Sequence, residues 1–449
     1  MDSVNFALAL KRFDPVAYQP HPPGYFLYVC LGRLSNLVFS DANAALVAIS
    51  ISFSCGAVAM IYWLAENWFG AAAARFAALI FLFSPLAWFH GMVALTYIVE
   101  AFFSALVGYL CWRGQGIAAA IALGVAGGFR PSSIVFLAPL LLFSLRKGQR
   151  VSAVFALILI TAAWFVPMVR LSAGMAYFSS LASLWITVPG KASVFNSTIL
   201  NSFARAITII GIYFLCFGCA ALLPVKGLDR DDREKRRFTL IWVTPALLFF
   251  TFVFLKFVNA GYLLILMPPV CAWLGLRASL LCWQPVALAG CAALNTAIFL
   301  FAPVYCSYSE VRAFEHELAS VIADIPRIAP SGSTMIVGLD SHFLGYRHAG
   351  YYLPQYRIVQ FPEVRLAAGE TVFAMARRDT TLEQRVDEKP FQNFVLFPLP
   401  SNDSEYGAFM AQVRRRLPSK DVQLIFRDSH EFAIAPVSDL HFLFPVVAR

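Results

Sequence analysis

Charged side chains are scarce in this 449-residue chain: Asp, Glu, Lys and Arg make up 14% of it, while 59% of its residues are hydrophobic. The mean hydropathy is +0.68. Soluble globular proteins carry about 25% charged and about 45–50% apolar residues. This deficit of charge excludes a soluble enzyme and predicts a polytopic α-helical membrane protein.

An exposed basic patch is also missing, although the formal net charge is +9. Residues 1–305 hold 20 basic and 9 acidic residues, a net of +11, whereas residues 306–449 hold 15 and 17, a net of −2. The excess lies in short connections between apolar runs, where it orients membrane proteins. A nucleic-acid-binding protein would instead gather Lys and Arg on one exposed face. Nucleic acid is therefore excluded as a partner.

Cysteine is absent after Cys306, and most of the nine cysteines lie in or beside apolar runs. A secreted disulfide framework would place pairs in the polar part of the chain, so that class is excluded. Cys216 and Cys219 form a C-x-x-C pattern, but no His or carboxylate stands near them. We interpret them as apolar helix side chains. No cofactor is predicted, and no residue cluster supports a divalent metal.

Long apolar runs dominate what is present. A transmembrane helix needs about 20 mostly apolar residues. The run 116–146 is too long for one helix and contains Gly127-Gly128-Phe129-Arg130-Pro131, so it is divided at this breaker. Ten spans are predicted in total, at 42–65, 72–90, 94–112, 116–129, 131–146, 151–170, 203–223, 239–257, 259–277 and 280–302.

Basic residues alternate between the connections in a way that predicts orientation. One side holds 12 of them, at positions 75, 113, 146, 147, 150, 226, 230, 233, 235, 236, 237 and 277. The other side holds 4, at positions 170, 191, 205 and 256. The positive-inside rule makes the first side cytoplasmic. Both ends of the chain are then extracytoplasmic.

Three regions follow from this pattern. Residues 1–41 form a first extracytoplasmic loop with a juxtamembrane helix over 25–39, and residues 42–302 form the transmembrane domain. Residues 303–449 alternate helical and β-rich runs, which predicts a small extracytoplasmic α/β domain. Its expected helices are 306–325, 341–352 and 404–417, and its expected strands are 335–339, 357–361, 371–376, 394–397, 423–426 and 431–435.

A few polar residues are candidates for chemistry. Asp2, in the polar first loop, could act as a general base or be a solvated tail carboxylate. Glu100 and Arg130 lie within apolar runs, where a charge costs about 2.5–3.5 kcal/mol on insertion scales and is functional by default. His90 and Lys256 lie at helix ends and could instead reach into the interface.

Several short motifs together resemble one family. Asp2-Ser3 with Phe6 precedes His21-Pro22-Pro23-Gly24-Tyr25 and Tyr28. Further along come Trp88-Phe89-His90, Leu95–Glu100, the Gly127–Ser132 break, and Tyr262-Leu263-Leu264 before Pro268-Pro269. Over residues 1–305 this order resembles the GT-C glycosyltransferases, which include the protein O-mannosyltransferases and the aminoarabinose transferase of lipid A.

The resemblance implies transfer of a sugar from a polyprenyl-phosphate donor to a protein, lipid or glycan acceptor outside the cytoplasm. The general texture of the sequence favours a bacterial inner membrane as the location. Asp2 matches the family's first-loop catalytic acid. Arg130 and Lys256 would hold the phosphate, and His21, His90, Tyr97 and Glu100 would shape the sugar and acceptor pocket. Many members carry a second acid where this chain has Ser3.

Two other classes remain open. A transporter or flippase of lipid-linked sugars would show internal repeats and paired broken helices, whereas the sequence shows one break and no repeat. A membrane scaffold would present the outer domain to a partner. Members of the resembled family also carry a helix before the catalytic acid. We therefore expect the native reading frame to extend upstream by one apolar segment of about 20 residues.

Overall fold

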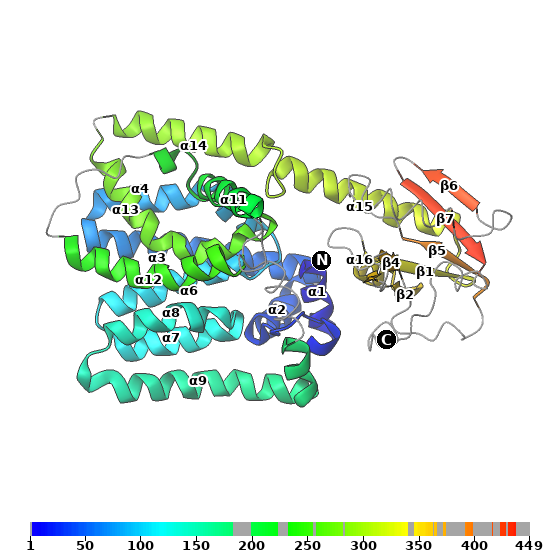
Figure 1. Cartoon of the computed structure of the whole chain (residues 1–449), viewed down its shortest axis with the longest axis horizontal. Coiled ribbons are helices and arrows are strands. Elements are labelled where there is room, and N and C mark those ends of the chain that lie inside the picture. Colours follow the sequence, from blue (N-terminus) through cyan, green and yellow to red (C-terminus); the bar gives the residue numbers. More distant parts are fainter. Residues whose placement is uncertain are drawn as a thin grey trace. The chain divides into compact units, whose positions relative to one another are not determined.

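The computed structural model describes residues 2–182, 199–222, 232–254, 257–281, 283–339, 345–361, 363–365, 371–373, 391–397, 415, 423–427 and 430–436. The chain divides into two compact units. One unit comprises Ala9–Glu310, and the other comprises Met1–Leu8 with Val311–Arg449. The first is helical and the second contains a sheet (Figure 1).

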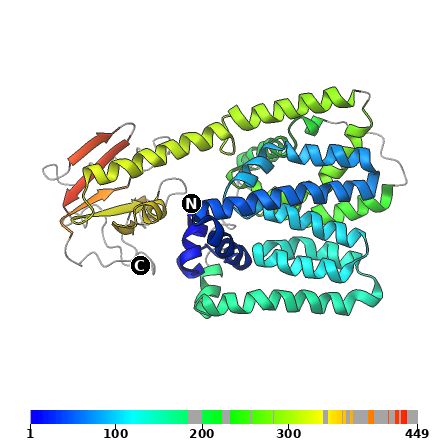
Figure 2. The same ribbon diagram turned by 180° about the vertical axis from the view of Figure 1, so that it is seen from behind.

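The described part of residues 1–302 is mainly helical. Its helices are α1 (Asp2–Lys11), α2 (Phe26–Phe39), α3 (Ala42–Phe69), α4 (Ala71–Leu82), α5 (Pro85–Met92), α6 (Tyr97–Trp112), α7 (Gly116–Phe129), α8 (Ser132–Ser144), α9 (Arg150–Leu171), α11 (Ile199–Phe217), α12 (Arg233–Phe252), α13 (Met267–Ser279) and α14 (Gln284–Phe301). Short 3₁₀ helices are η1 (Pro15–Ala17), η2 (Lys147–Gln149), η4 (Gly218–Leu222) and η6 (Phe257–Leu266). Both views show α7, α8 and α9 side by side, with α9 at the edge (Figures 1 and 2).

Several of these helices are long and apolar enough to cross a bilayer. Within the described residues there are four: Ala42–Phe69, Lys147–Leu171, Ala260–Ser279 and Gln284–Phe301. The bent pair of α4 and α5 makes a fifth if it counts as one span. Shorter apolar helices accompany them. The chain is thus a multi-pass membrane protein, while the number of ten spans stays a prediction.

Two helix breaks interrupt the apolar body. The break between α7 and α8, at Arg130 and Pro131, is where the sequence predicts it. The second was not predicted: α4 and α5 meet at 61°, within the run that we expected to be one span over 72–90. There the Ser84 hydroxyl accepts a hydrogen bond from the Ala87 amide at 3.2 Å, and Pro85 occupies the first turn. Ser followed by Pro starts a new helix.

The first loop is more regular than its polar, proline-rich sequence predicts, because α1 occupies Asp2–Lys11. Arg33 of α2 holds the end of α1, donating from Nε to the Leu10 carbonyl at 3.0 Å and from Nη2 to the Ala9 carbonyl at 3.1 Å. These are carbonyls that a helix end leaves without an internal partner. The expected juxtamembrane helix at 25–39 is α2.

The C-terminal region is a small α/β domain. Its strands are β1 (Thr334–Leu339), β2 (Arg357–Phe361), β3 (Glu363–Arg365), β4 (Thr371–Phe373), β5 (Asn393–Leu396), β6 (Gln423–Arg427) and β7 (His430–Pro436). The larger sheet has the order β2-β1-β5-β7-β6, in which β1 is parallel to β2 and β5, and β7 is antiparallel to β5 and β6. β3 was not predicted.

Among the described residues of this domain, two helices pack on its core: α15 (Tyr308–Ile328) and α16 (Tyr346–Tyr352). Val321 and Ile325 of α15 are fully buried and pack in one cluster with Ile336 and Val395 of the sheet. The expected helix over 404–417 lies outside the described residues apart from Arg415, as does the start of the expected 341–352 helix.

Candidate functional site

The break between α7 and α8 positions the central residue of the site. Arg130 ends α7 in an extended conformation, with φ −153° and ψ 102°, and its amide still donates to the Ala126 carbonyl. Pro131 then starts α8, since proline cannot continue the preceding helix. The break turns the Arg130 side chain inward, where it is 3% exposed.

A buried ion pair joins this break to the start of α6. Arg130 Nε lies 2.9 Å from Glu100 Oε2, and Glu100 is 1% exposed. The hydroxyls of Ser132 and Ser133 each donate to Glu100 Oε1 at 3.2 Å. Arg130 Nη1 donates to Thr96 Oγ1 at 2.9 Å. Each charge has a counter-charge and hydrogen bonds, which a buried ion requires.

Tyrosine rings cover the guanidinium of Arg130. Its Cζ lies 4.1 Å from the ring centroid of Tyr97 and 4.3 Å from that of Tyr262, and Tyr25 is at 5.9 Å. Such cation–π contacts hold an arginine plane in a fixed orientation. Tyr262 comes from η6, so segments distant in sequence meet at this one side chain.

Two histidines lie at the margins of the cluster. The His90 ring centroid is 4.7 Å from that of Tyr97, and His90 is 2% exposed. Neither ring nitrogen of His90 has a hydrogen-bond partner among the described residues. His21 Nε2 is 3.1 Å from the Tyr25 hydroxyl. Gly261 lies against the His90 ring so closely that any Cβ there would overlap it.

The structure thus brings together five of the predicted site residues: Glu100, Arg130, Tyr97, His90 and, through Tyr25, His21. Asp2 is half-buried in the first turn of α1 and belongs to the other compact unit. Lys256 lies outside the described residues. The roles predicted for all seven remain proposals.

Four further members were not predicted as site residues, although all but Ser133 lie within the motifs quoted above: Thr96, Ser132, Ser133 and Tyr262. The two serines directly follow the breaker, and Thr96 directly precedes the helix of Glu100. Small hydroxyl side chains that flank an intramembrane charge are a usable signal, because such a charge needs donors or acceptors nearby. Nothing in the sequence connects Tyr262 to Arg130.

The arrangement can bind a polar ligand. The described residues contain no group of three His, Cys, Asp or Glu that could hold a metal ion. The ion pair has no net charge, and the rings of Tyr97 and Tyr262 lie close to the guanidinium. Glu100 and Thr96 occupy Nε and Nη1, and no described residue accepts a hydrogen bond from Nη2. This edge can donate to an oxygen-rich ligand.

Gly24, in the His21–Tyr25 motif, gives the first testable prediction. Its φ is +102°, and a Cβ would lie 2.9 Å from Met168 Sδ, so Gly24→Ala combines backbone strain with a steric clash. We expect a lower thermal midpoint of unfolding in detergent. Gly70→Ala is the control, since Gly70 has φ +85° but nothing within 4 Å of its Cβ position. Equal losses in both variants would mean that the loop tolerates the clash.

Comparisons with known proteins extend this description. Residues 17–166 match the model of the protein O-mannosyl-transferase TMEM260 N-terminal domain. A search of curated protein sequences returned no match.

Among solved structures, ArnT from Cupriavidus metallidurans bound to undecaprenyl phosphate is similar, with a TM-score of 0.60 and 13% identity. The match covers 97% of this chain and 93% of that one. Its apo state has a TM-score of 0.57 at the same identity and coverage.

Proposed function

Because the chain has the fold of the GT-C glycosyltransferases, we propose that it transfers a sugar from a polyprenyl-phosphate donor to an acceptor outside the cytoplasm. The observation that carries this proposal is the likeness to ArnT over 97% of the chain, in a structure that holds undecaprenyl phosphate. The sugar is a hexose or pentose. The acceptor is a glycan, lipid or protein.

Asp2 is the proposed general base. The acceptor hydroxyl loses its proton as its oxygen attacks the anomeric carbon of the sugar, and a positioned carboxylate accelerates such a step by about 10²–10⁴-fold. The bond between the anomeric carbon and the phosphate oxygen breaks, and the lipid phosphate leaves as an anion. The donor carries its own activation, so this chemistry requires no nucleotide or organic cofactor.

Arg130 and Lys256 are the proposed phosphate ligands. The Nη2 edge of Arg130 is directed by the Glu100 pair and by the rings of Tyr97 and Tyr262. A hydrogen-bond donor fixed in this way stabilises the charge that develops on the leaving phosphate, because the donor does not have to reorient during the reaction. Lys256 follows the end of α12 in sequence and would add a second positive charge.

His21, His90, Tyr97 and Glu100 are the proposed walls of the sugar and acceptor pocket. His90 has two buried ring nitrogens without a described partner, and His21 is oriented by Tyr25. Sites that bind sugars need a few well-placed polar groups among apolar and aromatic ones. The charge bias of the connections supports an extracytoplasmic first loop and C-terminal domain. The proposed location is a bacterial inner membrane.

Transfer can be tested on the purified chain in proteoliposomes. The probes are undecaprenyl-phosphate-linked mannose and aminoarabinose, each with mixed hydroxyl acceptors, and the measurement is release of undecaprenyl phosphate. We expect acceptor-dependent release with one of the donors. Movement of the donor across the bilayer without release would instead establish a flippase. If neither release nor movement is observed, the result favours a scaffold.

A further inference from the structure

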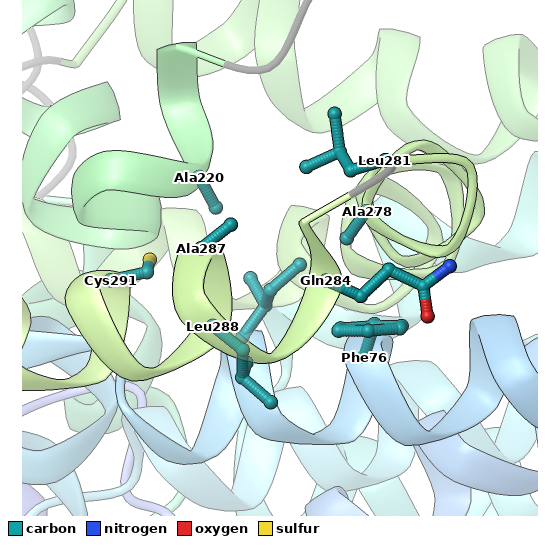
Figure 3. A pocket seen from close by; sticks show the side chains of 9 residues that line it. Phe76, Ala220, Ala278, Leu281, Gln284, Ala287, Leu288 and Cys291 are labelled. Atoms are coloured by element: carbon teal, nitrogen blue, oxygen red, sulfur yellow. The ribbon is translucent and has the colours of Figure 1, made fainter.

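A second site lies in the helical unit, apart from the polar cluster. It is a cavity of about 230 Å³ between α4, η4, α13 and the start of α14 (Figure 3). Phe76 and Ile80 of α4, Ala278 of α13 and Ala287, Leu288 and Cys291 of α14 contribute to its wall. The polar cluster involves α6, η6 and the α7–α8 break, so the two sites share no residue.

The chemistry of this cavity fits a hydrocarbon chain. Among the described residues that line it, Gln284 is the one polar side chain other than the thiol of Cys291, and the Gln284 amide donates to the Ser279 carbonyl at 2.5 Å. A sugar or peptide would need several convergent donors and acceptors, which are missing here. Apolar cavities of about 150 Å³ already take up benzene-sized apolar molecules. A segment of alkyl chain therefore matches both the size and the lining.

Residues typical of the membrane interface stand next to the cavity. Arg75 precedes Phe76 in α4, is exposed, and has no ion-pair partner among the described residues. Arg277 precedes Ala278, and Trp283, which is 75% exposed, precedes the first residue of α14. Arginines in apolar helices extend toward lipid headgroups, and tryptophans gather at the same level.

Arg75 lies near the start of α4 and Arg277 near the end of α13, and helix packing brings these two helix ends together. A Cβ on Gly275 of α13 would touch Ala77 of α4 at 2.7 Å, so the last turns of α13 lie beside the first turns of α4. α14 is mostly exposed, since only 11% of its 18 residues are buried inside the structure. The cavity is thus bordered by a helix that faces lipid and lies near two positive charges.

We propose that this cavity binds one anionic phospholipid, with an acyl chain in the cavity and its phosphate at Arg75 and Arg277. The lipid is not the sugar donor. Tyr262 of the polar cluster precedes α13, whereas Ala278 lies near its far end. Thirteen helical residues separate the two ends by about 20 Å. This site is independent of the proposed transfer reaction.

Native mass spectrometry of the purified full chain tests the site, using phosphatidylglycerol and phosphatidylcholine with identical acyl chains. One phosphatidylglycerol should be retained about 25-fold more than phosphatidylcholine, as expected for two arginine contacts that contribute about fivefold each. Arg75→Gln should lower this preference about fivefold, while Arg113→Gln, at an exposed loop arginine, should keep it. Equal preference in both variants would overturn the charge assignment.

The cavity itself is tested by Ala287→Phe, which fills it, against Val286→Phe on the 68%-exposed neighbouring position. We expect the first variant to lose the retained lipid and the second to keep it. Equal retention would overturn the proposal. It would also be overturned if undecaprenyl phosphate displaced the phospholipid from the wild type but did not bind Ala287→Phe, because the cavity would then belong to the donor.

Discussion

Replacing Asp2 by Asn should lower sugar transfer at least about 10²-fold, while the chain still inserts and folds. Asn keeps the shape of the side chain but cannot accept the proton of the acceptor hydroxyl. The measurement is the initial rate of undecaprenyl phosphate release at saturating donor, together with the thermal midpoint of unfolding. A loss in rate with an unchanged midpoint identifies a chemical role.

Asp14→Asn is the matched control, because it removes a nearby carboxylate of the same loop. Asp14 Oδ1 accepts the Ala17 amide at 3.2 Å, which an Asn oxygen can also do. The variant loses only the pair with exposed Arg12, worth about 0–1 kcal/mol. If Asp2→Asn retained a rate within a few-fold of the wild type, the base would lie elsewhere, with Glu100 the next candidate.

Breaking the Glu100–Arg130 pair should cause the largest loss of stability. Arg130→Gln leaves the buried Glu100 carboxylate without its counter-charge, which costs about 3–5 kcal/mol. Glu100→Gln likewise leaves the buried Arg130 guanidinium without its counter-charge. The double variant Glu100→Gln with Arg130→Gln removes both charges and should recover most of the loss. The measurement is the thermal midpoint of the wild type, both single variants and the double variant in one detergent.

Arg170→Gln serves as the control, because Arg170 is exposed near the end of an apolar helix and surface changes stay within about 0.5 kcal/mol. A double variant as unstable as its parents would show that the two charges are not coupled. Transfer separates the functional role: the double variant should fold but stay inactive. If the double variant transferred sugar at the wild-type rate, cations other than Arg130 would bind the phosphate.

Local sequence patterns were sufficient to predict most helices and most strands. The breaker at Arg130 was visible because Gly, Gly and Pro cluster around it in an apolar run. The bend between α4 and α5 was missed because Ser84 and Pro85 interrupt the hydrophobicity of 72–90 only briefly. α1 was missed because its ten residues lie in a segment otherwise rich in turn formers.

The site was predictable in its members but not in their contacts. The cost of placing a charged side chain in the bilayer marks Glu100 and Arg130 individually as exceptional. That they neutralise each other depends on how α6 packs against the α7–α8 break, which hydrophobic patterns do not encode. Tyr262 shows the same limit, since its contact with Arg130 joins positions more than a hundred residues apart. Such contacts become visible only in three dimensions.

The Glu100–Arg130 pair also bears on how the chain is assembled. Its partners lie on consecutive membrane segments, with Glu100 emerging from the ribosome first. Entering lipid one at a time, each charge would meet a barrier of about 2.5–3.5 kcal/mol. If the two charges enter lipid together, the barrier is much smaller, because each charge supplies the counter-ion of the other. During biogenesis, α6, α7 and α8 are therefore expected to leave the translocon together, as one preassembled group of helices.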